Sequence, residues 1–376
     1  MGEPLKLHGR RVFPDMAARL RAVAGEAAAE LRIGEFTFYW PEGPLDEEGA
    51  RALLGTRALG MPLELLPIAT SGATMAALYV SPLVGAADGD AERGFPVVMY
   101  LPEERAATPV ASSVTGLLHF AFACCRDAAA DPAGHHVSTA DARRCLEAAR
   151  RLDAALGLGH RFELELPDPE AAPIRWHAAF LGFDPEAPYS LAVEAQRAAE
   201  RREVPEARRM LARAAAQAPW FAPIHIAAAL LELEAKAIPD ALWSFYRALA
   251  VPAHGSGETT RSPFYGLPLA FEVDLDPMAF CHSYRASAPA DLRAAPFWEL
   301  LLEGDPTNPA AWLATGRALA ARGRDRDARM ALLVAHDLQL EAVAPLEELG
   351  ALAARGGDWL LATTCDLELD ALRHAA

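Results

Sequence analysis

Residues 95–125 have the sequence FPVVMYLPEERAATPVASSVTGLLHFAFACC. Two short apolar runs flank a charged turn, and a pair of serines then leads into a long apolar stretch. Short apolar runs between proline and charged residues are typical of buried strands, and serine is a preferred residue at the start of a helix. The stretch therefore predicts a strand, a turn, an extended segment, and a helix from Val114 to about Cys125 that Ser112 or Ser113 caps.

The residues on either side extend this pattern. Alternating aromatic residues predict a strand at 35–40, and two apolar runs predict strands at 63–69 and 75–84 around a turn. Apolar residues at helical spacing predict helices at 14–32, 46–59 and 138–157, the last with Ser138 or Thr139 at its start and Gly157 at its end. Helices at both ends of a group of strands are typical of an α+β domain, which we expect to span residues 1–159.

The composition changes after this domain. Prolines and scattered aromatic residues at 160–188 predict an ordered, non-regular connector. Residues 189–376 carry helical periodicity throughout. The sequence therefore predicts a second, all-helical domain.

Residue types recur at a fixed spacing in the helical part. Pro205 and Pro239 are 34 residues apart, as are Gly316 and Gly350. Further pairs with this spacing are Ala207 and Ala241, Gly323 and Gly357, and Ala328 and Ala362. The tetratricopeptide repeat, a helix–turn–helix unit, has this length, and residues 189–252 and 306–376 resemble that family. We expect a short solenoid of about five units, with a loop inserted near 252–276 where the register shifts.

Short segments of the first domain carry a second resemblance. They are residues 59–62, 66–72, 96–101, 110–113 and 117–118, together with an acid at Glu103 or Glu104. In this order they resemble the SUKH superfamily, which includes yeast cell-wall regulators and many bacterial immunity proteins. The resemblance covers about residues 14–125. The acidic, glycine-rich segment of that family is reduced here to TSGAT, and an acid-rich loop lies instead at 85–94.

The chain is acidic, with a formal net charge of −16 at pH 7 over 376 residues. A surface of this sign repels nucleic acid and anionic lipid and favours basic partners. We therefore predict a protein partner and neither a nucleic-acid nor a membrane partner. The exposed acids that we expect to contact it are Asp88, Asp90, Glu92, Glu103 and Glu104. A solvated loop and hairpin turn would carry the same residues, because acidic side chains also keep a surface soluble.

The cysteines indicate a reducing compartment. There are five of them, and Cys124 and Cys125 are adjacent in an apolar stretch, which is not the pattern of a disulfide framework. We expect this pair to lie in the hydrophobic core. The sequence contains neither a secretory signal pattern nor an apolar run long enough to cross a bilayer. These features predict a cytoplasmic protein.

A search for chemistry in the sequence finds little. The sequence contains none of the common phosphate-loop, dinucleotide, zinc-protease or serine-hydrolase motifs. His135 and His136 are adjacent on a predicted loop, and neighbours of this kind rarely ligate one ion together. Glu163 and Glu165 would share a strand face, without a nearby base to complete an acid–base pair. We therefore predict no catalytic residue, no cofactor and no metal.

Three functions remain open. The resemblance to SUKH proteins implies a non-enzymatic immunity factor that binds a basic toxin domain of a polymorphic toxin system. A second hypothesis is a helical-repeat adaptor in secretion or assembly, and a third is an enzyme with a site built from scattered residues. The predicted first helices of the repeats are rich in Ala and Leu, with Arg317 and Arg355 as their main basic groups. This composition favours an apolar groove, or packing on the first domain, over a clamp for an acidic terminus.

Overall fold

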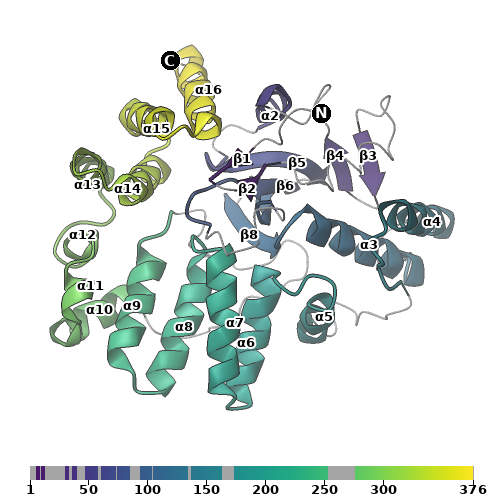
Figure 1. Ribbon diagram of the computed structural model, residues 1–376, viewed down its shortest axis with the longest axis horizontal. Helices are drawn as coiled ribbons and strands as arrows, with labels where there is room; N and C mark the ends of the chain where they lie inside the picture. The colour runs from purple at the N-terminus through teal and green to yellow at the C-terminus, as the bar shows by residue number, and fades with distance from the viewer. Residues whose placement is uncertain are drawn as a thin grey trace. The chain divides into compact units, whose positions relative to one another are not determined.

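The computed structural model describes residues 6–8, 10–12, 30–33, 36–39, 47–57, 61–72, 74–84, 94–103, 105–133, 137–162, 173–252 and 276–375. The chain divides into two units. Figure 1 colours it by residue number. The first unit comprises Met1–Arg57, Leu65–Glu194 and Arg261–Leu267, and the second comprises Ala58–Glu64, Ala195–Thr260 and Pro268–Ala376. The second unit therefore includes one short segment from the N-terminal part of the chain.

An antiparallel sheet organises the first unit. Its six strands are β3 Glu30–Ile33, β4 Phe36–Tyr39, β5 Leu65–Ser71, β6 Thr74–Tyr79, β7 Val97–Leu101 and β8 Ala106–Ala111. Each strand pairs with the next one along the sequence, and a separate two-stranded sheet joins β1 Lys6–Leu7 to β2 Arg10–Arg11. This order is a meander, in which short connections suffice because neighbouring strands run in opposite directions.

The strands predicted at 35–40, 63–69, 75–84 and 95–101 are present as β4, β5, β6 and β7, but β6 ends at Tyr79, five residues before its predicted end. Every residue of β6 is buried, which explains why apolar residues follow one another from Met75 to Leu78 and do not alternate with polar ones. The predicted extended segment before the helix is a full strand, β8, which pairs with β7 over residues 106–111. The opening stretch is therefore a β-hairpin followed by a helix.

The helix predicted for 14–32 is wrong at its C-terminal end. Glu30–Ile33 form strand β3, which pairs with β4, while residues 13–29 lie outside the described residues. Leu31 lies opposite Phe38 and Ile33 opposite Phe36 in this pair. Backbone pairing with β4 therefore favours a strand here over the helix that the local sequence predicts.

Four helices accompany the sheet: α2 Glu47–Leu54, α3 Val114–Ala130, α4 Thr139–Leu156 and α5 Pro173–Phe180. The capping predictions are confirmed. The Ser138 hydroxyl accepts the Asp141 N–H at the start of α4, and Gly157 ends that helix with a left-handed φ of 64°.

Helix α5 contradicts the prediction that residues 160–188 lack regular structure. Trp176 and Phe180 of this helix pack edge-on against Phe120 of α3, with ring centroids 5.4 and 5.7 Å apart. Pro173 begins the helix at a position where a missing N–H is tolerated. The prolines therefore bound a helix that the aromatic contacts hold in place.

Helices make up the described part of the chain beyond residue 188, apart from their connections. They are α6 Pro188–Glu200, α7 Val204–Gln217, α8 Ala222–Glu234, α9 Ile238–Leu249, α10 Pro277–Ser283, α11 Ala290–Arg293, α12 Trp298–Leu302, α13 Pro309–Ala321, α14 Asp325–Leu338, α15 Val343–Arg355 and α16 Trp359–Ala375, with a 3₁₀ turn at Arg285–Ser287. Figure 1 shows α8 beside α9, and α13, α14, α15 and α16 also pack in sequence order. An α+β part followed by a helical part is thus confirmed, while residues 253–275 of the predicted loop lie outside the described residues.

Four turns between helices share one backbone geometry. Arg202, Lys236, Gly323 and Gly357 all have a left-handed φ, between 59° and 73°. In each turn the following residue donates its N–H to the carbonyl five positions earlier, as Asp358 does to Ala353 at 2.9 Å. Arg202 and Lys236 are 34 residues apart, as are Gly323 and Gly357. The sequence spacing therefore corresponds to a repeated helix–turn–helix geometry.

The glycines inside the helices allow close packing. A Cβ on Gly316 would lie 2.8 Å from Cγ of Leu332, closer than a real contact, so α13 and α14 approach each other at a residue without a side chain. Gly350, 34 residues later, faces Cys365 of α16, where a Cβ would lie 3.4 Å away. Trp312, Leu332 and Leu346 belong to the continuous apolar core of the second unit. None of the helices in the described residues has the length and apolarity needed to cross a membrane.

Candidate functional site

Of the five acids predicted to bind a partner, the described residues include one. Glu103 is exposed in the turn between β7 and β8. Arg105 closes that turn with a φ of 51°, and its N–H donates to the Pro102 carbonyl at 3.3 Å. The other four, Asp88, Asp90, Glu92 and Glu104, lie outside the described residues. The structure thus confirms an exposed position for Glu103 alone.

The junction between β8 and α3 is built from two serines with different tasks. Ser113 is the N-cap of α3, and its hydroxyl accepts the Gly116 N–H at 3.3 Å. Ser112 donates its backbone N–H and its hydroxyl to the two carboxylate oxygens of Asp184, at 2.7 and 2.6 Å. A Cβ on Gly116 would lie 2.1 Å from one of those oxygens, so the carboxylate occupies the space of a missing side chain. This buried contact anchors the turn after α5 at the N-terminus of α3, where negative charge is favourable.

Two histidines form a buried pair between α3 and the segment after α4. The Nδ1 atoms of His119 and His160 are 3.1 Å apart, and Phe183 stacks on His160 with ring centroids 4.4 Å apart. Burial lowers the pKa of His119, and burial together with the nearby positive groups lowers the pKa of His160 to about 3. The backbone N–H of His160 donates to a carboxylate oxygen of Asp153 at 2.9 Å. Neutral rings at this distance share one hydrogen bond, with one Nδ1 as donor.

These histidines do not assemble a metal centre within the described part of the chain. No group of three or more His, Cys, Asp or Glu side chains there is arranged to hold an ion. His135 and His136, considered above as ligands, lie outside the described residues, as do Glu163 and Glu165. Cys124 and Cys125 are buried in α3, as predicted for core residues.

A third buried histidine, His177, contacts a hydroxyl group. Nδ1 of His177 lies 2.9 Å from Oγ of Ser190, which joins α5 to the first turn of α6. Burial lowers the pKa of His177 to about 4, and among the described residues its Nε2 atom has no hydrogen-bond partner. A Ser–His contact is one component of a nucleophilic site. Both residues are buried, since Ser190 is 2% and His177 is 4% exposed. The pair therefore belongs to the packing of α5 against α6.

The second unit contains a buried ion cluster. Arg329 of α14 donates to Glu64 and to Asp358, both at 2.6 Å, and all three side chains are at most 6% exposed. Burial alone would lower the pKa of Arg329, but the two carboxylates raise it, so the guanidinium stays charged. Asp358 also accepts the Leu361 N–H at 3.1 Å, which caps α16. Glu64 and the neighbouring core residue Leu63 thus tie the segment 61–64 into the helical unit.

The two arginines predicted on the first helices of the repeats have different surroundings. Arg317 of α13 donates to Glu348 of α15 at 2.9 Å, which links these two helices. Arg355 is exposed at the end of α15. Helix α8, by contrast, buries most of its apolar residues, including Ile224 and Leu231. The exposed residues of α13 are Arg317 and four alanines, and those of α15 are Val343, Glu347, Ala351, Ala354 and Arg355.

No family model matches the chain, and no curated protein does. The resemblances to SUKH proteins and to tetratricopeptide repeats therefore have no support from these comparisons and rest on the sequence motifs quoted above.

Sequence reasoning missed the residues that form the buried polar contacts. Asp184 lies in the motif FDPE, where an acid before proline usually indicates only a turn. Arg329 lies among small and apolar residues that are buried in α14. A charged residue within such an apolar pattern was the signal in the sequence that could have indicated a buried ion pair. Neither signal identifies a partner, because the partners of these two residues lie 72 and 265 positions away.

Proposed function

We propose that this chain is a non-enzymatic interaction protein, in which a SUKH-like first unit and tetratricopeptide-like helical pairs recognise another protein. The repeated helix–turn–helix geometry at Arg202, Lys236, Gly323 and Gly357 is the observation that carries the proposal. Stacked helical pairs of this length present extended surfaces to protein partners. The hairpin and capped helix of residues 97–130 support the SUKH part, since they follow the element order of that family.

The partner that we propose is a basic toxin domain, which the chain would bind and block as a bacterial immunity factor. A net charge of −16 accelerates association with a basic protein, because the long-range field steers the encounter. Glu103 in the β7–β8 turn is exposed, so its carboxylate is accessible to such a partner. Asp88, Asp90, Glu92 and Glu104 complete the proposed surface.

Co-purification from the native host, with identification of the captured protein, tests this function. Reversal of Asp88, Asp90, Glu92, Glu103 and Glu104 to Arg should weaken capture by about tenfold or more and reduce its dependence on salt. The melting temperature should change little, because reversal of exposed charges alters stability by less than about 0.5 kcal/mol per site.

A matched variant separates this local effect from a change in net charge. Asp325, Glu341 and Glu347 are exposed acids of the helical unit. Reversal of these three acids to Arg should leave capture within about twofold of that by the original chain. The variant to compare with it is the reversal of Asp88, Asp90 and Glu92 alone. If the two triple variants lose capture equally, or if neither does, the proposed acidic surface is wrong.

A helical-repeat adaptor is the second candidate, and the exposed faces of α13 and α15 favour it. Arg317 and Glu348 link these helices through an ion pair between exposed side chains, and exposed alanines of α13 lie beside it. A secretion or assembly component recovered by co-purification, with no toxin domain among the captured proteins, would support the adaptor over the immunity factor.

A further inference from the structure

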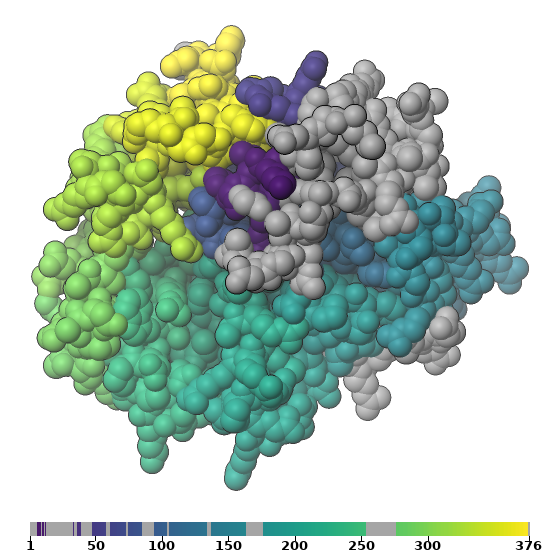
Figure 2. Space-filling view, viewed as in Figure 1, coloured from purple at the N-terminus to yellow at the C-terminus, as the bar shows by residue number. Residues whose placement is uncertain are grey.

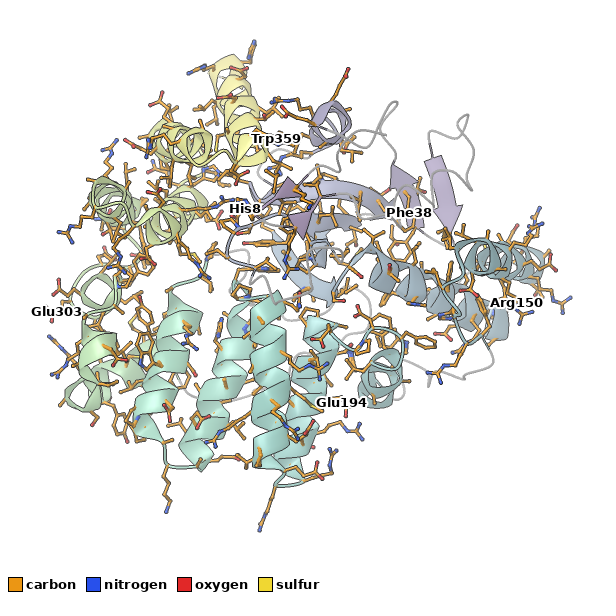
Figure 3. All side chains as sticks on the ribbon, in the orientation of Figure 1. His8, Phe38, Arg150, Glu194, Glu303 and Trp359 are labelled. Carbon is orange, nitrogen blue, oxygen red and sulfur yellow. The ribbon has the colours of Figure 1, made fainter. Side chains whose placement is uncertain are left out.

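Helix α4 presents a basic face in an acidic protein. Ala142, Ala149, Leu152 and Leu156 are its buried residues, and the helix packs on α3. The remaining surface carries four exposed arginines, Arg143, Arg144, Arg150 and Arg151. Figure 2 shows atoms of this part of the chain at the surface, and Figure 3 shows side chains of α4, with Arg150 labelled, extending away from α3.

These arginines form two parallel rows. Residues seven apart in a helix lie about 10.5 Å apart along the axis and point in nearly the same direction. Arg143 and Arg150 make one row, and Arg144 and Arg151 make the other, about 100° further around the helix. The strip between the rows contains Ala140, Glu147 and Ala154, which are all exposed. Two of these three residues are small, so a second helix can approach closely along the strip.

Among the described residues, only one of these four arginines forms an ion pair. Asp141 forms an ion pair with Arg144. Arg143 and Arg151 have no ion-pair partner among the described residues. Arg150 lies over the ring of Phe162, with its guanidinium carbon 5.6 Å from the ring centroid, a contact that orients the side chain and leaves its charge unpaired. Within the described part of the chain, Arg143, Arg150 and Arg151 therefore form no ion pair, and the α4 face carries positive charge.

We propose that the exposed face of α4 binds an acidic helical segment of another protein. A partner helix with carboxylates seven residues apart would repeat at the same 10.5 Å or so as the arginine rows and could pair with both of them. Nucleic acid fits less well, because Glu147 lies between the rows and the chain as a whole is strongly negative. This surface shares no residue with the acidic surface of the proposed function and does not depend on it.

The test is a fluorescence titration of the full chain against a labelled helical peptide. The probe is an Ala-based peptide of about 21 residues that carries two Glu side chains in every heptad on one face. The double variants R143A/R150A and R144A/R151A should each weaken binding by about fivefold or more. Glu147→Ala should strengthen binding by about twofold, since it removes a like charge from the strip.

The controls make each outcome decisive. The variant R322A/R355A removes the same charge from exposed positions of the helical unit, and it should change binding by less than about twofold. A peptide of the same composition with its Glu residues distributed around the helix should bind more weakly than the probe. The proposal is overturned if the chain does not bind the probe, if the control variant loses as much affinity as the α4 variants, or if the scrambled peptide or a single-stranded oligonucleotide binds as well as the probe.

Discussion

At the scale of single residues, the buried polar side chains Asp184 and Arg329 each depend on particular hydrogen-bond or ion-pair partners. The Asp184 carboxylate receives two hydrogen bonds from Ser112 and fits only because residue 116 is glycine. In the second unit, Arg329 lies between two carboxylates in an otherwise apolar environment. A buried charge of this kind is stable only while its partners are in place, because each lost partner leaves an unpaired charge away from water.

This dependence leads to a prediction for Arg329. Arg329→Met should lower the free energy of unfolding by about 3–5 kcal/mol, since Glu64 and Asp358 would remain buried without a counter-charge. The triple variant R329M/E64Q/D358N should recover part of that loss, because it removes all three charges together. Chemical denaturation of each variant measures the effect.

An exposed ion pair in the same helix provides the control. Arg324 pairs with Asp327 near the start of α14, with side chains that are 44% and 32% exposed. Arg324→Met should therefore cost less than about 1 kcal/mol. Equal losses for Arg324→Met and Arg329→Met would contradict the structural importance of the buried cluster.

At the scale of elements, the repeated turn is the feature that sequence and structure share most closely. Four turns use a left-handed residue, but only two of them use glycine. Arg202 and Lys236 adopt the same φ with a Cβ, which is unfavourable for a residue that is not glycine. The geometry is therefore imposed by the packing of the flanking helices in two of the four turns.

The difference between these turns predicts substitutions of opposite sign. Lys236→Gly should raise the free energy of unfolding by up to about 1 kcal/mol, because it removes the strain of a left-handed lysine. Gly357→Ala should lower it by about 1 kcal/mol, because it introduces the same strain. Thermal or urea denaturation compares the two variants, and changes of the same sign would show that the turn backbone does not control stability.

At the scale of the whole molecule, buried histidines make stability depend on pH. Burial is the main cause that lowers the pKa of His160 to about 3 and those of His177 and His225 to about 4, from an ordinary value of 6.5. The unfolded chain gains protons as the pH falls through 6.5, whereas the folded chain does not until about pH 4. The contribution of these groups is therefore fully present above pH 6.5 and is lost progressively as the pH falls toward 4.

Each such histidine should reduce the free energy of unfolding by about 1.4 kcal/mol for every pH unit in that window. His225→Gln should make the free energy of unfolding depend less steeply on pH, because Gln does not titrate. Gln can still donate to the Pro219 carbonyl that His225 contacts at 2.8 Å. Urea denaturation between about pH 6.5 and 4 measures the slope. His374→Gln, a change at an exposed position, is the control. An unchanged slope in His225→Gln would show that this histidine titrates alike in both states.

The sequence by itself determined the features that depend on neighbours along the chain. The strands at 35–40, 63–69 and 75–84, the hairpin and helix of 95–125, and the caps of α3 and α4 all follow from local pattern and turn chemistry. The 34-residue spacing also indicated where the helical turns lie, because each repeat places the same residue types at the same points of contact.

Tertiary structure alone decided the rest. Residues 30–33 became a strand because β4 pairs with them, and residues 173–180 became a helix because Phe120 packs against them. Ser112 contacts Asp184, and Arg329 contacts Glu64. These partners are 72 and 265 positions apart, and no local pattern connects them. A buried charge or strand edge needs a partner, but only the folded chain specifies which of many distant residues will supply it.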